Sequence, residues 1–202
     1  MKATYLGTAV LAAALALAGC GGKSEFTITG AFYDSLGNKV PLKNPGLQLA
    51  NGDDVISVPV GTTDFSFPKT VEYGSNYNVV VKTQQQHMTC SPKSSAGVAG
   101  RMESVAVALQ CLQNTYSVVV TVKGLAAGTS VNLINGSTVQ AASATTAIPT
   151  PAISFPGIPV GSTYGIAVFE QPAGMTCTVT NGAGTMGDAD RVDTVVDCVK
   201  NP

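Results

Sequence analysis

Short runs of alternating apolar and polar residues recur along the chain and predict β-strands. Residues 26–29 read Phe-Thr-Ile-Thr, and residues 116–123 form a longer run of the same kind. Such alternation places the apolar side chains on one face of a half-buried strand. Further runs at residues 65–67 and 153–155 are each followed by a proline, which cannot donate to a β-ladder. No stretch after the first nineteen residues shows helical periodicity, so the pattern predicts an all-β protein.

The pattern is written twice. Adding 87 to the residue numbers of a block in the first half gives a matching block in the second half. The first block contains Tyr77, Gln84, Met88, Cys90 and Cys111, and the second contains Tyr164, Gln171, Met175, Cys177 and Cys198. We therefore predict two domains, at residues 25–111 and 115–202, joined by a linker at residues 112–114. A linker this short favours two domains stacked end to end as a stiff rod.

Turn signals divide each copy into about seven short strands. Asn51-Gly52 and Asn135-Gly136 are strong hairpin dipeptides, because both residue types tolerate positive φ. Other turn signals follow every eight to twelve residues, roughly the spacing that is typical of β-sandwiches. The expected fold is two tandem Ig-like or prealbumin-like β-sandwiches, and the pattern does not decide between these two topologies.

The N-terminus has the form of a secretory signal. Lys2 precedes an apolar run over residues 9–18, which rises about 15 Å and is too short for a bilayer core of about 30 Å. Residues 17–20, Leu-Ala-Gly-Cys, resemble the lipobox of bacterial lipoproteins. That resemblance implies cleavage after residue 19, a thioether-linked diacylglycerol on Cys20 and additional acyl chains such as palmitate. Residues 1–19 are then a signal peptide and residues 20–24 a short acylated tether.

The cysteine count leads to the same interpretation. The sequence has five cysteines, an odd number that would leave one free thiol in an exported protein. If Cys20 carries lipid, four remain, two in each copy at the same separation. We predict disulfides Cys90–Cys111 and Cys177–Cys198, which persist in an oxidising compartment. Metal ligation is the alternative, but zinc sites usually combine closely spaced cysteines with histidines, and the chain has one histidine.

Part of the first copy resembles a known domain family. Residues 28–41, together with residues 65–67 and 74–79, are similar to carboxypeptidase-regulatory and Cna-B prealbumin-like domains. That resemblance implies a seven-stranded sandwich that acts as a spacer, stalk or interaction module. Cna-B domains often carry a Lys–Asn isopeptide bond, whereas here the last strand of each copy ends in a cysteine, so a disulfide is expected instead. The repeated block around Cys177 also resembles tandem repeats of bacterial cell-surface lipoproteins.

The two copies differ most in two loops, at residues 32–45 and 141–151. Variable loops on a repeated scaffold are where a binding surface is expected. The first loop includes Phe32 and Tyr33, which are the candidate binding residues. Its ligand would be a peptide, a polysaccharide or an ion, although the absence of tryptophan disfavours glycan recognition.

Composition and motifs argue against catalysis and nucleic-acid binding. Without Lys2 the chain has 10 basic and 12 acidic side chains, a net charge of −2, and the basic residues are scattered. One histidine and no nucleophile motif leave no catalytic site to assemble, and no cofactor or metal is expected. Asp188, Asp190 and Asp193 depart from the calcium-loop pattern and are interpreted as a solvated turn.

Two functional hypotheses remain. The first is a non-enzymatic outer-membrane lipoprotein with a structural or adhesive role, attached to the membrane by lipid. Gly21 stands where some bacteria use an aspartate as an inner-membrane retention signal. The second is a module that binds an envelope or extracellular protein or polysaccharide through the variant loops or an exposed strand edge.

Overall fold

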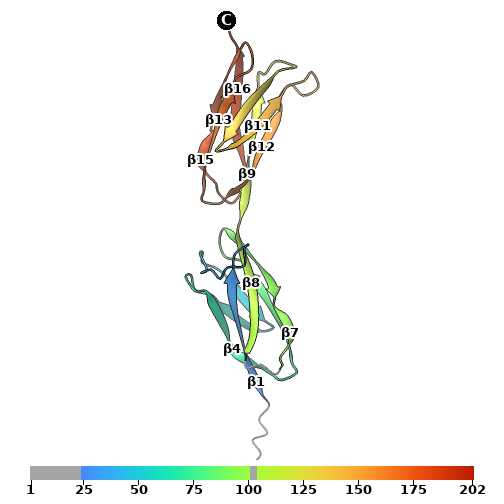
Figure 1. The fold of residues 1–202 in the computed structure, drawn as a ribbon, viewed down its shortest axis with the longest axis vertical. Coiled ribbons are helices and arrows are strands. Elements are labelled where there is room, and N and C mark those ends of the chain that lie inside the picture. Colours follow the sequence, from blue (N-terminus) through green and yellow to red (C-terminus); the bar gives the residue numbers. More distant parts are fainter. Residues whose placement is uncertain (1–23, 101–103) are drawn as a thin grey trace, which may run out of the picture.

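The computed structural model describes residues 24–100 and 104–202, and these form β-strands joined by turns and loops (Figure 1). No helix in this part of the chain is long and apolar enough to cross a membrane. The predicted signal peptide and Cys20 lie outside the described residues. The all-β prediction is confirmed.

The first module contains two four-stranded sheets. One has the strand order β4-β1-β8-β6 and the other the order β3-β2-β5-β7. The strands are β1 (Glu25–Tyr33), β2 (Gln48–Asn51), β3 (Asp54–Ser57), β4 (Asp64–Glu72), β5 (Asn76–Thr83), β6 (Met88–Ser94), β7 (Ala96–Val98) and β8 (Ser104–Gln113).

The second module repeats this topology strand for strand. Its sheets have the orders β12-β9-β16-β14 and β11-β10-β13-β15. The strands are β9 (Thr115–Lys123), β10 (Ser130–Asn135), β11 (Thr138–Ser143), β12 (Ala152–Pro159), β13 (Thr163–Glu170), β14 (Met175–Thr180), β15 (Ala183–Thr185) and β16 (Arg191–Lys200). In both modules the first strand runs parallel to the last one, and the other paired strands are antiparallel. The described part of each module thus has eight strands where about seven were expected, since it includes the three-residue strands β7 and β15.

Alternation along the strands builds one apolar core in each module. On β1 the side chains of Phe26, Ile28 and Phe32 are buried in the first core, and on β9 Val118 and Val120 are buried in the second. The two Asn-Gly pairs form the predicted hairpins, with Gly52 and Gly136 both at φ 58°. The local pattern therefore predicted the strands and their inward faces correctly over most of the chain.

One cross-strand pair shows how side-chain volume differs between the two cores. Gly30 of β1 lies opposite Phe65 of β4, whose ring covers the place where a side chain at position 30 would lie. In the second module Val120 of β9 lies opposite Ile153 of β12. A glycine–phenylalanine pair in one copy thus corresponds to a valine–isoleucine pair in the other, so the volume is redistributed between partners.

Two sequence-based boundaries need correction. Strand β8 extends to Gln113 and β9 begins at Thr115, so Asn114 alone separates the strands where a linker at residues 112–114 was expected. The variant loop expected at residues 141–151 begins later, because β11 continues to Ser143. On β16, Val192 is 69% exposed although Thr194 and Val196 on the same strand are buried, because the pairing of β16 with β9 shifts register between Arg191 and Thr194.

The two modules lie end to end, and the chain passes from β8 into β9 along the long axis of the molecule (Figure 1). Asn114 contacts both modules at this point. Its backbone N–H donates to the carbonyl of His87 at 2.9 Å, and its own carbonyl accepts from the N–H of Val160 at 3.0 Å. The end-to-end arrangement expected from the short linker is therefore observed.

Candidate functional site

Both predicted disulfides are present, each between directly opposed residues of neighbouring antiparallel strands. Cys90 on β6 faces Cys111 on β8, and Cys177 on β14 faces Cys198 on β16. All four side chains are buried in the cores. The disulfides therefore staple the last strand of each module to its neighbour. Their burial indicates a structural role, because a reactive thiol pair would need access to solvent.

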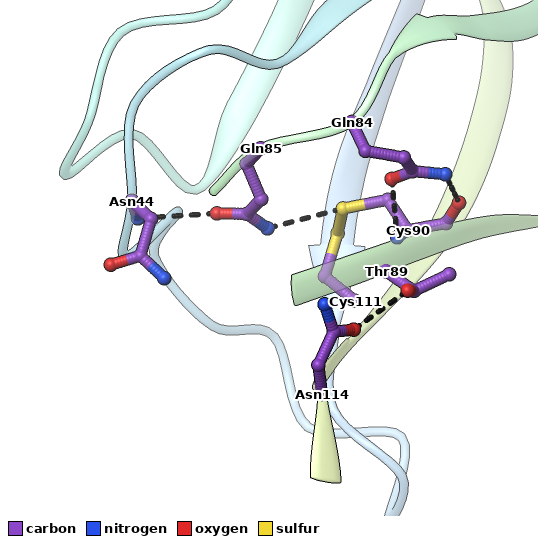
Figure 2. Close-up of a disulfide and its surroundings, with 7 residues drawn as sticks. All are labelled: Asn44, Gln84, Gln85, Thr89, Cys90, Cys111 and Asn114. Atoms are coloured by element: carbon purple, nitrogen blue, oxygen red, sulfur yellow. Dashed lines mark hydrogen bonds between the residues drawn. A yellow bond between two sulfur atoms is a disulfide. The ribbon is translucent and has the colours of Figure 1, made fainter. Parts of the chain in front are cut away.

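A glutamine from the repeated block holds the first cysteine of each staple. The side-chain amide of Gln84 accepts from the N–H of Cys90 at 2.8 Å and donates to its carbonyl at 2.9 Å (Figure 2). Gln171 makes the same two bonds to Cys177, at 2.7 and 3.0 Å. The amide thus replaces a strand partner for the cysteine backbone. The exact 87-residue offset marked these glutamines as a pair, but sequence reasoning did not identify their role.

The first module adds a second, buried glutamine. Gln85 is 3% exposed, and its amide N–H lies 3.2 Å from the sulfur of Cys90. Its carbonyl oxygen accepts from the N–H of Asn44 at 3.1 Å, as Figure 2 shows. Gln85 therefore ties the variant loop at residues 32–45 to the staple. The second copy has Pro172 at this position, so its loop lacks the equivalent bond.

The structure separates the two predicted binding residues. Phe32 is 0% exposed and packs against Phe65 with 5.4 Å between ring centroids. The interpretation of Phe32 as a surface binding residue is therefore wrong, because β1 continues to Tyr33 and places alternate side chains inward. Tyr33 is half-buried on the outer face of the sheet and lines a groove.

This groove has a volume of about 590 Å³ and crosses β4, β1 and β8. Its lining includes the small side chains of Ala31 and Ala106 and the side chain of Tyr33. Lys39, from the variant loop, and Asp64, from β4, also line it and form an ion pair at 2.5 Å. Hydrogen bonds from Lys39 and then from Thr63 lower the pKa of Asp64 below its usual range, so this carboxylate stays charged at neutral pH.

A tight turn holds Lys39 beside the groove. The carboxylate of Asp34 accepts from the N–H groups of Leu36 and Asn38, at 2.9 and 2.8 Å, and from the Asn38 side chain at 3.1 Å. The bonds from Asn38 lower the pKa of Asp34 most. The backbones of Tyr33 and Lys39 also form a β-bridge across the turn, so this short segment positions both residues at the groove.

The junction between the modules contains a second group of polar side chains. Nδ1 of His87 lies 2.7 Å from a carboxylate oxygen of Asp188, and the Gln113 side chain donates to the carbonyl of Val160 at 3.1 Å. The pairing of His87 with Asp188 spans 101 positions, and no local sequence signal indicates it. A cleft of about 390 Å³ lies beside this contact.

The three aspartates considered for calcium point to different partners. Asp188 pairs with His87, Asp190 accepts from the N–H of Ser117 at 2.7 Å, and Asp193 pairs with Arg191 at 2.9 Å. Among the described residues, no group of three or more acidic, histidine or cysteine side chains is arranged to hold a metal ion.

Comparison with known proteins identifies the fold. No protein-family profile matches the sequence, and no curated protein matches it. The chain is similar in structure to the Bacillus anthracis TIE protein, with a TM-score of 0.53 and 11% identity over 88% of this chain and 34% of that one. A streptococcal ancillary pilin also aligns, with a TM-score of 0.33 and 15% identity over 89% of this chain and 63% of the pilin. A B repeat of the Staphylococcus aureus collagen-binding protein aligns at 0.33 with 12% identity, over 90% of this chain and all of the repeat.

This chain thus spans about a third of the TIE protein and under two thirds of the pilin. At 11% identity the likeness to the TIE protein concerns the fold alone. It agrees with the two-sandwich architecture described above.

Proposed function

We propose that the protein is a non-enzymatic, lipid-anchored stalk of the bacterial cell envelope with a structural or adhesive role. The observation that carries this proposal is the end-to-end joining of two stapled sandwiches through a single residue, Asn114. An anchored rod holds its far end away from the membrane, which is what a spacer or adhesin requires. The lipobox at residues 17–20 provides the anchor, and several acyl chains hold firmly where one is marginal.

We expect Cys20→Ala to release the protein from the membrane. Without the sulfur atom no thioether lipid forms, and the described residues contain no helix that could replace the anchor. The measurement is the fraction of protein that pellets with the outer membrane, which should fall from nearly all of the protein to a small background because the acyl chains supply the attachment. Ser24→Ala, in the same tether, is the control and should remain bound. Quantitative membrane retention of Cys20→Ala would remove the anchor from the proposal.

The groove of the first module supports a second candidate, in which the stalk also binds an envelope or extracellular peptide. Small side chains at its floor allow an extended backbone to approach the sheet closely, and Tyr33 offers a flat apolar wall with a polar hydroxyl. Lys39 and Asp64 can each bond to a peptide main chain or side chain. The second module has Thr121 and Asp193 on its corresponding outer strand positions, so its sheet lacks the alanine floor.

On this second candidate, Tyr33→Ser should weaken binding of envelope extract to the immobilised full chain by about tenfold or more, as expected for a central aromatic contact. Tyr73→Ser is the matched control, because Tyr73 is a 56% exposed tyrosine of the same module that does not line the groove. Unchanged binding in Tyr33→Ser would exclude the groove as the contact surface.

A further inference from the structure

The backbone at His87 adopts a conformation that favours glycine. His87 has φ 61°, and the equivalent position of the second copy is Gly174 at φ 68°. The turn is otherwise the same in both copies, since the carbonyls of His87 and Gly174 accept from the N–H groups of Asn114 and Asn201, each at 2.9 Å. Residues with a side chain are disfavoured in this left-handed region of backbone dihedral angles. The resulting backbone strain is retained where the side chain has another role.

The role visible in the structure is a contact with the other module. His87 Nδ1 lies 2.7 and 2.8 Å from the two carboxylate oxygens of Asp188. Asp188 belongs to the loop that follows β15, and His87 to the turn before β6, so the pair bridges the modules. Gly174 lies at the opposite end of the second module and has no side chain to make an equivalent contact.

Other charged groups near the pair are few. Lys43, from the variant loop, lines the same cleft, whose remaining lining is uncharged apart from His87 and Asp188. Asp190, two residues beyond Asp188, is directed to the backbone of Ser117. A positively charged imidazole at position 87 would face the Asp188 carboxylate directly, at 2.7 Å, with Lys43 as the other charged group of the cleft.

We propose that His87 and Asp188 form a pH-dependent latch that holds the two modules in line. Histidine side chains ordinarily change charge between about pH 5 and 8, so acid adds a charge-assisted bond at the junction. At higher pH the neutral ring retains a weaker hydrogen bond, and the modules bend more freely about Asn114. Since both side chains are about half exposed, the pair shifts the ratio of aligned to bent molecules by about two- to fivefold.

The latch rests on the rod arrangement of the proposed function and predicts how its stiffness varies. The test uses full-length protein in detergent micelles, with spin labels carried by a noncanonical amino acid at Val80 and Val139, which are 42% and 45% exposed. The inter-label distance distribution should be narrow at pH 5.5 and broaden at pH 8, with the ratio of aligned to bent molecules falling by about two- to fivefold. A mean distance far from the end-to-end value at both pH values would contradict the rod itself, whereas a constant distribution at that value would contradict only the latch.

Three variants isolate the pair. His87→Gly should fold stably, because it restores the residue of the second copy, but its distribution should be broad at both pH values. His87→Lys keeps a charge throughout this range and should stay narrow at pH 8. Gly174→His is the control for strain: it should lower the stability of the second module without changing the distribution. If the inter-label distance distribution of His87→Gly still broadened between pH 5.5 and pH 8, the pH dependence could not be assigned to His87.

Discussion

Removing either disulfide is expected to lower the free energy of unfolding of its own module by about 3 kcal/mol. The cysteines of each pair are 21 positions apart, and the chain-entropy relation gives about this value for a loop of that length. The double variants Cys90→Ala/Cys111→Ala and Cys177→Ala/Cys198→Ala test it by urea denaturation followed by circular dichroism. Because each module has its own core, the loss should appear in one module's transition and leave the other unchanged.

Chemical reduction provides the control for the disulfide prediction. Reduced wild-type protein should lose stability in both modules. The loss of unfolding free energy in each module should equal that caused by the corresponding double alanine variant. Intact mass should also rise by four hydrogens on reduction, two for each bond. Double variants as stable as the wild type would show that the disulfides do not stabilise the modules by restricting the conformational freedom of the unfolded chain.

Gly30→Val is expected to destabilise the first module by about 3 kcal/mol, at the upper end of overpacking effects. A Cβ at position 30 would lie 2.2 Å from a ring carbon of Phe65 and 2.7 Å from the carbonyl oxygen of Val107. Phe65→Ile removes the first clash and recreates the valine–isoleucine pair of the second module. The double variant Gly30→Val/Phe65→Ile should therefore regain about half of the loss, measured by the same denaturation experiment.

The second module offers a reciprocal test of the same pair. Val120→Gly alone should destabilise it by opening a cavity, and Val120→Gly/Ile153→Phe should recover part of that loss. A coupling energy of about 1–2 kcal/mol is expected from each cycle, as for residues in direct contact. If the single effects simply add in both modules, the two side chains do not share one volume.

The staples and most strands could be predicted from local pattern, because side-chain direction alternates along a strand whatever its neighbours are. The 87-residue offset paired the cysteines, and each pair faces its partner across an antiparallel ladder. The same alternation along the strand also directs the side chain of Phe32 inward. It continues the inward series of Phe26 and Ile28, so ending the strand at Gly30 placed Phe32 wrongly in a loop.

The sequence by itself determined a duplicated all-β scaffold and its cysteine pairing, since periodicity and spacing are properties of the chain. Only the tertiary structure decided what the differences between the copies do. It placed Tyr33 with Asp64 at one groove, and His87 with Asp188 across 101 positions at the junction. These contacts join segments that are distant in the chain, and they depend on how the sheets and modules pack, which no local alternation specifies.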